Sequence, residues 1–213
     1  GDRPAAEARA VAGSSGATNA AAVDTSEQLF PAVEEHIEIA VMQVDYTIEG
    51  RGDDEYPIIH VFGRTAEEDL VHVKVFEFKP YFYAPTDNIT EGRLQEYERI
   101  TDSEETDDDG EPYESIRGEQ LTKIFGQTPR DVGQMRDDFD HYEADILFPN
   151  RFLIDKDVTS GIRIPARDVE TEQSGNDART IRVHHDEVEP VEVDARPRVN
   201  TFDIEVDDRS GFP

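Results

Sequence analysis

The stretch Phe202-Asp203-Ile204-Glu205-Val206 alternates apolar and acidic residues close to the last residue of the chain. Because successive side chains of a β-strand point to opposite faces, Asp203 and Glu205 would share one face. Such a carboxylate pair can bind two divalent cations about 3.5–4 Å apart, which activate water and stabilise the leaving oxygen in phosphodiester hydrolysis. Taken alone, the pair would be an ordinary solvated strand face. With the stretches that precede it, we predict Asp203 and Glu205 as catalytic and metal-binding residues.

Three further stretches precede this one in the chain. They are Val44-Asp45-Tyr46, then Phe78-Lys79-Pro80-Tyr81-Phe82-Tyr83-Ala84, then Arg151-Phe152-Leu153-Ile154-Asp155-Lys156. In this order, the four stretches resemble archaeal family B DNA polymerases from about residue 37 to residue 206. Phe-Asp-Ile-Glu is similar to the first exonuclease motif of that family, and the Lys-Pro-Tyr-x-Tyr-Ala and Arg-x-Leu-Ile-Asp-Lys runs are more specific than any single motif.

The resemblance implies the N-terminal part of a DNA-directed DNA polymerase of DNA replication that also carries a 3'-5' proofreading exonuclease. The complete enzyme would use Mg²⁺ or Mn²⁺, and its partners would be single-stranded template, primer-template DNA and a sliding clamp. The polymerase aspartates and the later exonuclease carboxylates of the family have no counterpart in these 213 residues. We therefore expect the fragment to be inactive and its magnesium binding to be weak or absent. Because the chain begins at Gly1 without a methionine and ends at Pro213 just after the predicted catalytic strand, we also expect both ends to be cuts.

The resemblance also implies a pocket that captures uracil in the template strand. The matching residues are Tyr46, Pro80, Tyr81, Pro129, Arg130, Val132, Ile146, Leu147, Phe148 and Arg151. By resemblance, the backbone amides of Tyr81 and Ile146 would bond the base, Pro80, Val132 and Phe148 would shape the slot, and Tyr46 and Arg151 would brace it. Uracil and thymine differ by one methyl group, so rejection of thymine would be steric. Two positions depart from the family: Arg130 stands where glutamine is common, and Leu147 where proline is common.

Three alternatives stay open at this point. The prolines and aromatic residues of the pocket could be ordinary core and turn residues, as buried aromatic residues usually are. The chain could be a stand-alone module that binds single-stranded or uracil-containing DNA. It could also derive from an inactivated polymerase paralogue, in which the later catalytic motifs would be altered.

Composition indicates how such a protein could coexist with DNA. The chain has a net charge of −29 and only four lysines among 21 basic residues, whereas phosphate binding normally needs a basic groove. We interpret this acidity as that of a halophilic protein in a high-salt archaeal cytoplasm, because at molar salt the Debye length is ~3 Å and the repulsion is local. The acidity could instead mark a basic partner or a disordered tail.

Other residue types exclude several site classes. Cysteine is absent, which excludes a disulfide framework, a thiolate zinc site and a thiol nucleophile. The six histidines form no His-Glu-x-x-His pattern, and His184 and His185 lie in a charged segment where solvation is the default interpretation. No apolar run approaches ~20 residues, so we expect no membrane partner. The resemblance to a DNA polymerase implies a cytoplasmic, nucleoid-associated protein.

Changes in pattern divide the chain into four predicted parts. They are a tail that we expect to be flexible (1–33), a β-rich part (34–158), a polar linker (159–179) and a further strand-forming part (180–213). The resemblance implies that the second part is a family B polymerase N-terminal domain with the template and uracil site, and that the last part is the start of a ribonuclease-H-like exonuclease domain. The predicted fold class is α+β: a β-rich domain with a few short helices, followed by the first strands of the truncated exonuclease domain.

Apolar periodicity and turn residues predict the individual elements. Three strands in an antiparallel meander should span Ile37 to Ile48, Pro57 to Phe62 and Leu70 to Phe78, and further strands Leu121 to Phe125, Thr180 to Val183, Val188 to Val193 and Val199 to Val206. A short helix is predicted from Ile89 to Ile100, one capped by Thr128 should run to about Phe139, and Ile146 to Lys156 should form a short amphipathic piece. The acidic segment 102–111 resembles half of an EF-hand, but Ile116 occupies the position of the required glutamate, so a solvated loop is favoured.

Overall fold

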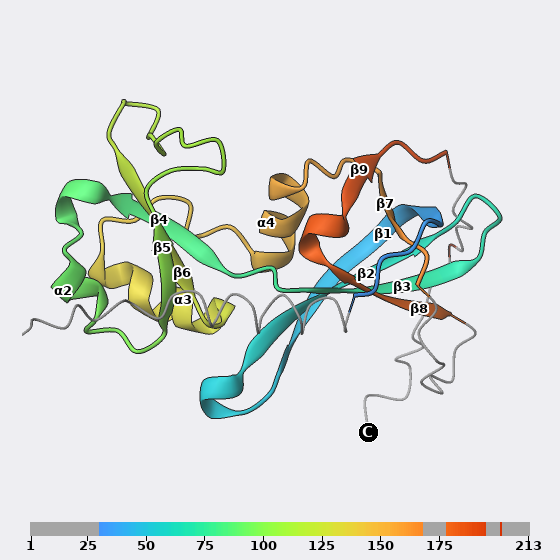
Figure 1. Ribbon diagram of the computed structural model, residues 1–213, viewed down its shortest axis with the longest axis horizontal. Helices are drawn as coiled ribbons and strands as arrows, with labels where there is room; N and C mark the ends of the chain where they lie inside the picture. Colours follow the sequence, from blue (N-terminus) through green and yellow to red (C-terminus); the bar gives the residue numbers. More distant parts are fainter. Residues whose placement is uncertain (1–29, 168–177, 195–200, 202–213) are drawn as a thin grey trace, which may run out of the picture.

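The larger of two β-sheets has six strands within the described residues, which are 30–167, 178–194 and 201 of this computed structural model (Figure 1). The strands are β1 (His36–Glu49), β2 (Tyr56–Arg64), β3 (Leu70–Phe76), β7 (Gly161–Pro165), β8 (Arg179–His184) and β9 (Glu189–Val191). Their order in the sheet is β8-β3-β2-β1-β7-β9. Strand β2 pairs antiparallel with β1 on one side and with β3 on the other, which confirms the predicted meander. Strand β8 pairs parallel to β3.

Strand β7 lies inside the segment that we predicted as a linker (159–179), so that segment is not linker throughout. Ile162 and Ile164 are fully buried, and β7 pairs with β1. The polar composition of the surrounding residues makes this five-residue strand hard to recognise in the sequence, although Pro165 is buried together with the two isoleucines.

The strands β8 and β9 join the same sheet as the meander. They occupy its two opposite edges, although only the short helix η4 (His185–Glu187) separates them in the chain. The sheet must therefore curl so that its edges approach each other at η4. The predicted start of a second domain near Thr180 is not accompanied by a new sheet in the described part of the chain, and the predicted strand from Val199 to Val206 lies almost wholly outside it.

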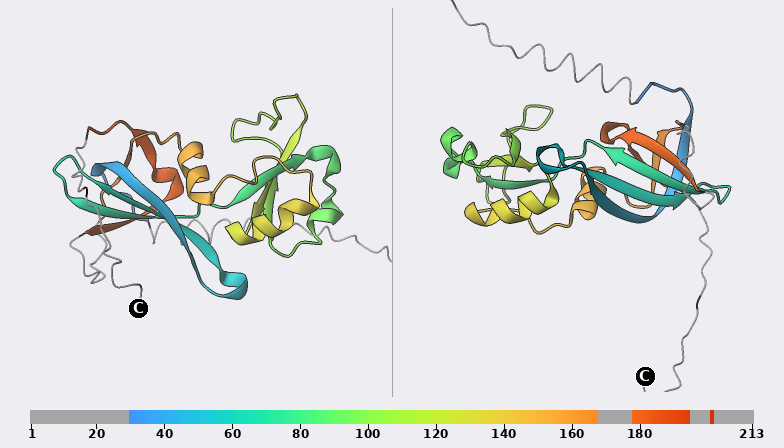
Figure 2. Two further views of the ribbon diagram at one scale, coloured as in Figure 1. Left: turned by 180° about the vertical axis from the view of Figure 1, so that it is seen from behind. Right: turned by 90° about the horizontal axis from the view of Figure 1, so that it is seen from below.

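A smaller sheet forms the second lobe, beside the first one (Figures 1 and 2). It contains β4 (Tyr81–Pro85), β5 (Ile100–Glu104) and β6 (Leu121–Gly126) in the order β4-β6-β5. Its short helices are η2 (Thr86–Asn88), α2 (Glu91–Leu94), α3 (Pro129–Met135) and η3 (Arg136–Asp138). The helix predicted from Ile89 to Ile100 is thus only the four residues of α2, and the acidic segment 102–111 begins within β5. The fold is α+β and rich in β-structure, as predicted.

The start of α3 follows the predicted capping pattern. The side chain of Thr128 accepts the N–H of Asp131 at 3.3 Å, and the Asp131 carboxylate accepts the N–H of Thr128 at 3.1 Å. This reciprocal pair satisfies two backbone donors that a helix start otherwise leaves without partners. Helix α3 ends at Met135, and η3 continues the chain to Phe139, where we predicted the end of the helix.

Helix α4 (Phe148–Asp155) lies between the two lobes (Figure 1). Its Phe152 is fully buried and packs with Phe78 and Phe148 in the core of the larger sheet. The second lobe has its own core, which includes Phe82, Ile124 and Val132. Helix α4 is thus anchored in the core of the larger sheet, and it also carries residues that line the site described next.

None of the helices in the described ranges is long and apolar enough to cross a membrane.

Candidate nucleic-acid site

A cavity of about 680 Å³ opens between strand β1, helix α3 and the segment that leads into α4. Binding sites for small molecules typically have volumes of about 300–1,000 Å³. All ten residues predicted for the pocket line this cavity: Tyr46, Pro80, Tyr81, Pro129, Arg130, Val132, Ile146, Leu147, Phe148 and Arg151. The fold therefore brings together four segments that are up to about one hundred residues apart.

A β-bulge in β1 turns Tyr46 toward the cavity. The pairing of β1 with β2 shifts between Val41 and Gln43. Before the shift, the odd-numbered Ile39 and Val41 pack on the core, whereas after it the even-numbered Val44 does so. An extra residue in a strand exchanges its two faces in this way, so Tyr46 lies on the same face as Val44.

Aromatic rings form one wall of the cavity. The ring of Tyr46 meets that of Phe148 edge to face, with centroids 5.4 Å apart and an interplanar angle of 81°. Phe148 packs in turn on Phe78, at 5.5 Å, and is only 6% exposed. Such edge-to-face contacts are favourable, and they fix the position of the Phe148 ring.

The backbone of β4 directs the amide of Tyr81 toward the cavity side. The N–H of Tyr83 donates to the carbonyl of Tyr142 at 3.2 Å, at the strand edge opposite β6. Backbone N–H groups two residues apart in a strand point to the same edge, so the N–H of Tyr81 faces the segment that continues from Tyr142 to Ile146. On the other edge, the N–H of Gly126 donates to the carbonyl of Pro80 at 2.9 Å.

The side chain of Tyr81 is held in a polar network behind the cavity wall. Its hydroxyl donates to Asp155 Oδ2 at 2.7 Å, and two cations contact its ring: Lys123 Nζ lies 4.2 Å and the guanidinium carbon of Arg151 4.8 Å from the ring centroid. Burial raises the pKa of the Tyr81 phenol, and the bond to Asp155 raises it further. Burial also raises the pKa of Asp155, against the opposing effect of the Tyr81 hydrogen bond, and lowers the pKa of Lys123.

Two arginines anchor the segment that carries Ile146. Arg151, which is 5% exposed, donates to the carboxylate of Glu143 at 2.7 Å and to the Glu143 carbonyl at 2.9 Å. Arg136 donates to the carbonyl of Ala144 at 2.8 Å and to the carboxylate of Asp145 at 2.6 Å. These four contacts hold residues 143–145 on both sides. The buried guanidinium of Arg151 thus holds the segment at Glu143 in place and does not face solvent.

Helix α3 supplies the wall opposite the aromatic rings. Val132 is 6% exposed and lies so close to Gly126 that a Cβ atom on this glycine would be 2.7 Å from Val132 Cγ2. Arg130 is exposed and pairs with Glu55 at 3.1 Å. Leu147, which also lines the cavity, is 69% exposed and occupies the position just before the start of α4.

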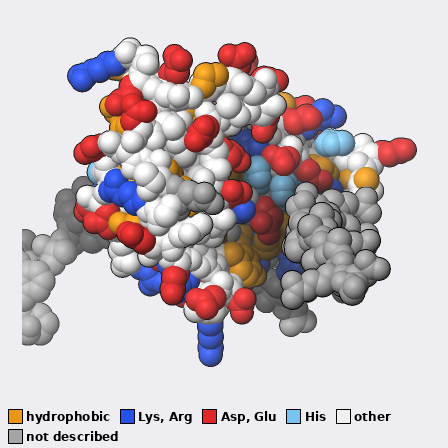
Figure 3. Space-filling view, turned by 60° about the vertical axis from the view of Figure 1, so that its left-hand side comes forward, with side chains coloured by type: hydrophobic (Ala, Val, Ile, Leu, Met, Phe, Trp, Pro, Cys, Tyr) orange, Lys and Arg blue, Asp and Glu red, His pale blue; other side chains and the backbone are white. Residues whose placement is uncertain are grey.

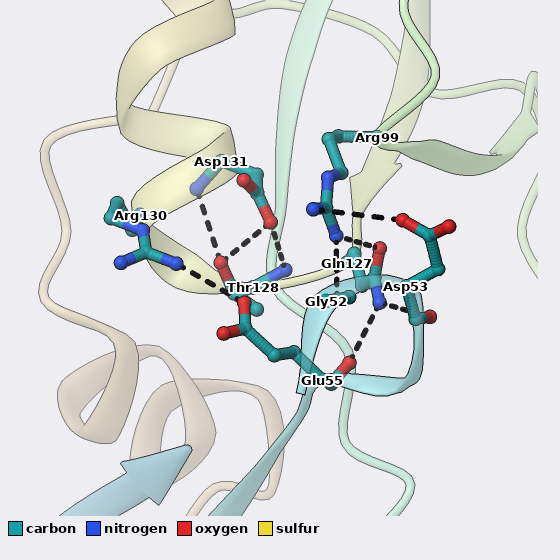
Figure 4. Close-up of polar contacts among 8 residues, drawn as sticks. All are labelled: Gly52, Asp53, Glu55, Arg99, Gln127, Thr128, Arg130 and Asp131. Atoms are coloured by element: carbon teal, nitrogen blue, oxygen red, sulfur yellow. Dashed lines mark hydrogen bonds and ion pairs between the residues drawn. The ribbon is translucent and has the colours of Figure 1, made fainter. Parts of the chain in front are cut away.

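The tip of the β1–β2 hairpin, which includes the short helix η1 (Gly52–Asp54), is tied to the second lobe beside the cavity (Figure 4). Arg99 donates to the carbonyl of Gly52 at 3.0 Å and to Gln127 Oε1 at 2.6 Å. The amide of Gln127 donates to the carbonyls of Asp53, at 2.6 Å, and Glu55, at 3.0 Å. These contacts fix β1, and with it Tyr46, relative to α3.

Several lining residues were not predicted. They are Val44, Asp45, Gly133, Arg136, Ala144, Asp145, Pro149 and Asn150. Most are chain neighbours of predicted residues, which is the signal that could have indicated them. The roles of Glu143 and Asp155 as partners of Arg151 and Tyr81 were also missed; the i, i+4 spacing of Arg151 and Asp155 on a helix would have indicated that they can pair.

Comparison with known proteins gives two findings. Residues 139–213 match the model of the exonuclease domain of DNA polymerase family B. The matched family is DNA polymerase family B. The fold is similar to that of the family B DNA polymerase from the hyperthermophilic archaeon Pyrobaculum calidifontis, with 24% sequence identity and a TM-score of 0.58 over 76% of this chain. No curated protein sequence matches the chain.

This chain spans about a fifth (21%) of the length of the Pyrobaculum calidifontis polymerase chain. The family B match begins at Phe139, earlier than the domain start that we predicted at residue 180, and it includes Asp203 and Glu205. Those two carboxylates lie outside the described residues, so their predicted roles in catalysis and metal binding stay predictions.

Proposed function

We propose that this chain is the N-terminal part of an archaeal family B DNA polymerase of DNA replication, and that its cavity captures uracil in the template strand. One observation carries the proposal: the ten residues matched to the family's uracil pocket come from separate segments and line a single cavity. Packing alone would not require the residues of that set to share a cavity. The family B match of residues 139–213 supports the same assignment.

The chemistry of the cavity suits a flipped nucleobase. Such a base needs apolar walls and a few fixed polar groups that bond its edge. Phe148, Pro80 and Val132 are buried walls, and the Tyr81 amide points toward the segment of Ile146, which two arginines hold in place. In this proposal, the amides of Tyr81 and Ile146 bond the polar edge of uracil, and the wall leaves no room for the methyl group of thymine.

Binding of the chain to single-stranded DNA with one uracil should be tighter than binding to the same strand with thymine in that position. Exclusion of a single methyl group corresponds to a preference of about 10–200-fold in affinity. Fluorescence anisotropy in molar potassium chloride measures both affinities. Because the two strands differ in one methyl group, the phosphate contacts cancel in the comparison. Equal affinities for the two strands would refute uracil capture by this chain.

The proposal assigns Asp203 and Glu205 to the first metal-binding carboxylates of the proofreading exonuclease. Their carboxylate oxygens are suitable ligands for Mg²⁺ or Mn²⁺, which would polarise the phosphodiester and lower the pKa of an attacking water. The match covers only 21% of the Pyrobaculum calidifontis polymerase chain, so the other catalytic carboxylates, the polymerase activity and a clamp-binding segment belong to the proposed complete enzyme.

The acidic surface supports a further part of the proposal, namely adaptation to high salt. Acidic side chains are scattered over the face shown in Figure 3, rather than gathered in one patch. Charges of one sign that cover a whole surface destabilise the folded state by mutual repulsion, and molar salt screens that repulsion to ~3 Å. We therefore propose a haloarchaeal type of polymerase.

Thermal melting across a potassium chloride series should show that the chain needs high salt to fold. With a net charge of −29, we expect the melting temperature to rise steadily with salt and the folded state to be lost well below about 1 M. Circular dichroism measures the transition. A potassium sulfate series at equal ionic strength separates screening from effects specific to chloride. Full stability at low salt would contradict the halophilic interpretation.

A further inference from the structure

Three consecutive residues at the joint between β8 and β9 place metal-ligating atoms close together. His184, His185 and Asp186 each offer one ligand atom, and these atoms lie within 4.8 Å of one another. His184 ends β8, and the other two residues begin η4. His184 is the extended N-cap residue of η4, and the turn that follows brings Asp186 back toward its imidazole, which accepts the Asp186 N–H.

The separations among these atoms suit a tetrahedral ion. The Nδ1 atom of His184 is 3.5 Å from Asp186 Oδ2, and the Nδ1 atom of His185 is 3.0 Å from Asp186 Oδ1. Zinc binds histidine nitrogen and carboxylate oxygen at about 2.0–2.2 Å, which separates adjacent ligand atoms of a tetrahedron by about 3.3–3.5 Å. The two distances are near this value but end on different oxygens of Asp186, so the carboxylate would have to rotate to present one oxygen between the two nitrogens.

Among the described residues, one of these ligand atoms has no hydrogen-bond partner. The Nδ1 atom of His185 is buried and makes no hydrogen bond, although most buried polar atoms make at least one. The Nδ1 atom of His184 accepts the backbone N–H of Asp186 at a long 3.3 Å. The Nδ1 atom of His184 therefore carries a lone pair, which a metal ion would take over from this long hydrogen bond.

The surrounding structure holds the histidines in place. The ring of His185 packs edge to face on Phe78, at 5.9 Å, and the ring of His184 packs on Phe30, also at 5.9 Å. The backbone N–H of His184 donates to Glu187 at 2.9 Å, and Arg167 in turn donates to the same carboxylate at 2.7 Å. Ligands fixed by such outer contacts lose little freedom when they bind a metal.

We propose that His184, His185 and Asp186 form a binding site for a zinc-like divalent transition-metal ion, with water in the fourth position. Two imidazole nitrogens and one carboxylate oxygen favour such ions over magnesium or calcium, which prefer oxygen ligands alone. Because η4 joins the two edge strands of the larger sheet, a bound ion would rigidify the turn between them. The proposal is independent of uracil capture and of the exonuclease carboxylates, and it replaces the interpretation of His184 and His185 as solvated residues.

The ammonium group of Lys156 would compete with a metal ion for Asp186. Its Nζ atom lies 3.6 Å from Asp186 Oδ1, so the lysine and a metal ion compete for the same carboxylate. A Lys156→Met variant keeps most of the side-chain volume and removes the charge. It should bind the metal more tightly than the wild-type chain does.

Titration of the chain with Co²⁺ tests the site, because tetrahedral cobalt absorbs visible light much more strongly than aqueous cobalt does. We expect saturation at one ion per chain in the wild type, and an affinity at least about tenfold weaker in His184→Ala and in Asp186→Asn. The exposed histidine variant His36→Ala is the matched control and should bind as the wild type does. Asp186 is 70% exposed, so Asp186→Asn should fold even if His184→Ala does not, and circular dichroism checks both.

Two results would overturn the proposal. One is a wild-type chain that gives no saturable tetrahedral cobalt spectrum. The other is equal affinity in the wild type, Asp186→Asn and His36→Ala, which would mean binding by scattered surface groups. Zn²⁺ should displace the cobalt and raise the melting temperature of the wild type but not that of Asp186→Asn, since an ion that binds only the folded state stabilises it.

Discussion

Replacement of Val132 by glutamine is expected to abolish the preference for uracil over thymine. Val132 is 6% exposed and forms the cavity wall on α3, against Gly126. Glutamine is longer and polar, so its side chain would extend into the cavity and occupy the space of the base. The ratio of the two affinities should fall from about 10–200 to about 1, whereas contacts to the DNA backbone would persist. Fluorescence anisotropy with the two strands measures the ratio.

Val132→Thr is the matched control for this variant. Threonine has nearly the size of valine, so the slot stays open and the preference should survive, although the buried hydroxyl lowers stability. Circular dichroism of both variants separates loss of the site from loss of the fold. A folded Val132→Gln variant that still prefers uracil would show that the base binds elsewhere.

Truncation of Phe152 to alanine is expected to destabilise the chain by about 3–5 kcal/mol, the usual cost of removing a large buried aromatic side chain. Phe152 is fully buried, and its ring packs edge to face on that of Phe78, with centroids 5.3 Å apart. The same helix carries Phe148 and Arg151, so loosening it should also widen the cavity. Denaturant unfolding in molar salt measures the loss in the free energy of unfolding.

Ile154→Ala on the same helix provides the comparison. Ile154 is 58% exposed, and surface substitutions usually change stability by no more than about 0.5 kcal/mol. Similar losses in the two variants would mean that α4 does not pack on the larger sheet as described. A large loss in Phe152→Ala alone supports that packing.

The membership of the cavity could be predicted only through the resemblance to archaeal family B DNA polymerases, and several of its residues stand in or beside recognisable runs. Pro80 and Tyr81 stand in the Lys-Pro-Tyr run, Arg151 opens the Arg-x-Leu-Ile-Asp-Lys run, and the Thr128 cap with Pro129 marks the start of α3. The partners of these residues could not be predicted. The pairing of Arg151 with Glu143, and the path of residues 142–147 along β4, depend on contacts that arise only when the chain has folded.

The order of the strands in the larger sheet could not be predicted either, for a related reason. The pattern of alternating residues identified β1, β2, β3 and β8 as strands, but alternation does not tell which strand pairs with which. Strand β8 pairs with β3, about one hundred residues earlier in the chain, and β9 pairs with β7. Strand β7 was missed because five residues among polar neighbours give too weak a pattern. The convergence of His184, His185 and Asp186 likewise depends on the η4 turn.

The central claim is that uracil binds in the cavity at the amides of Tyr81 and Ile146. Amide chemical shifts of the ¹⁵N-labelled chain, recorded in molar salt with a uracil-containing and a thymine-containing strand, test it most directly. We predict that uracil, and not thymine, causes the largest shift changes at Tyr81, Ile146 and the neighbouring cavity residues. Equal changes with both strands, or changes confined to residues away from the cavity, would contradict the claim.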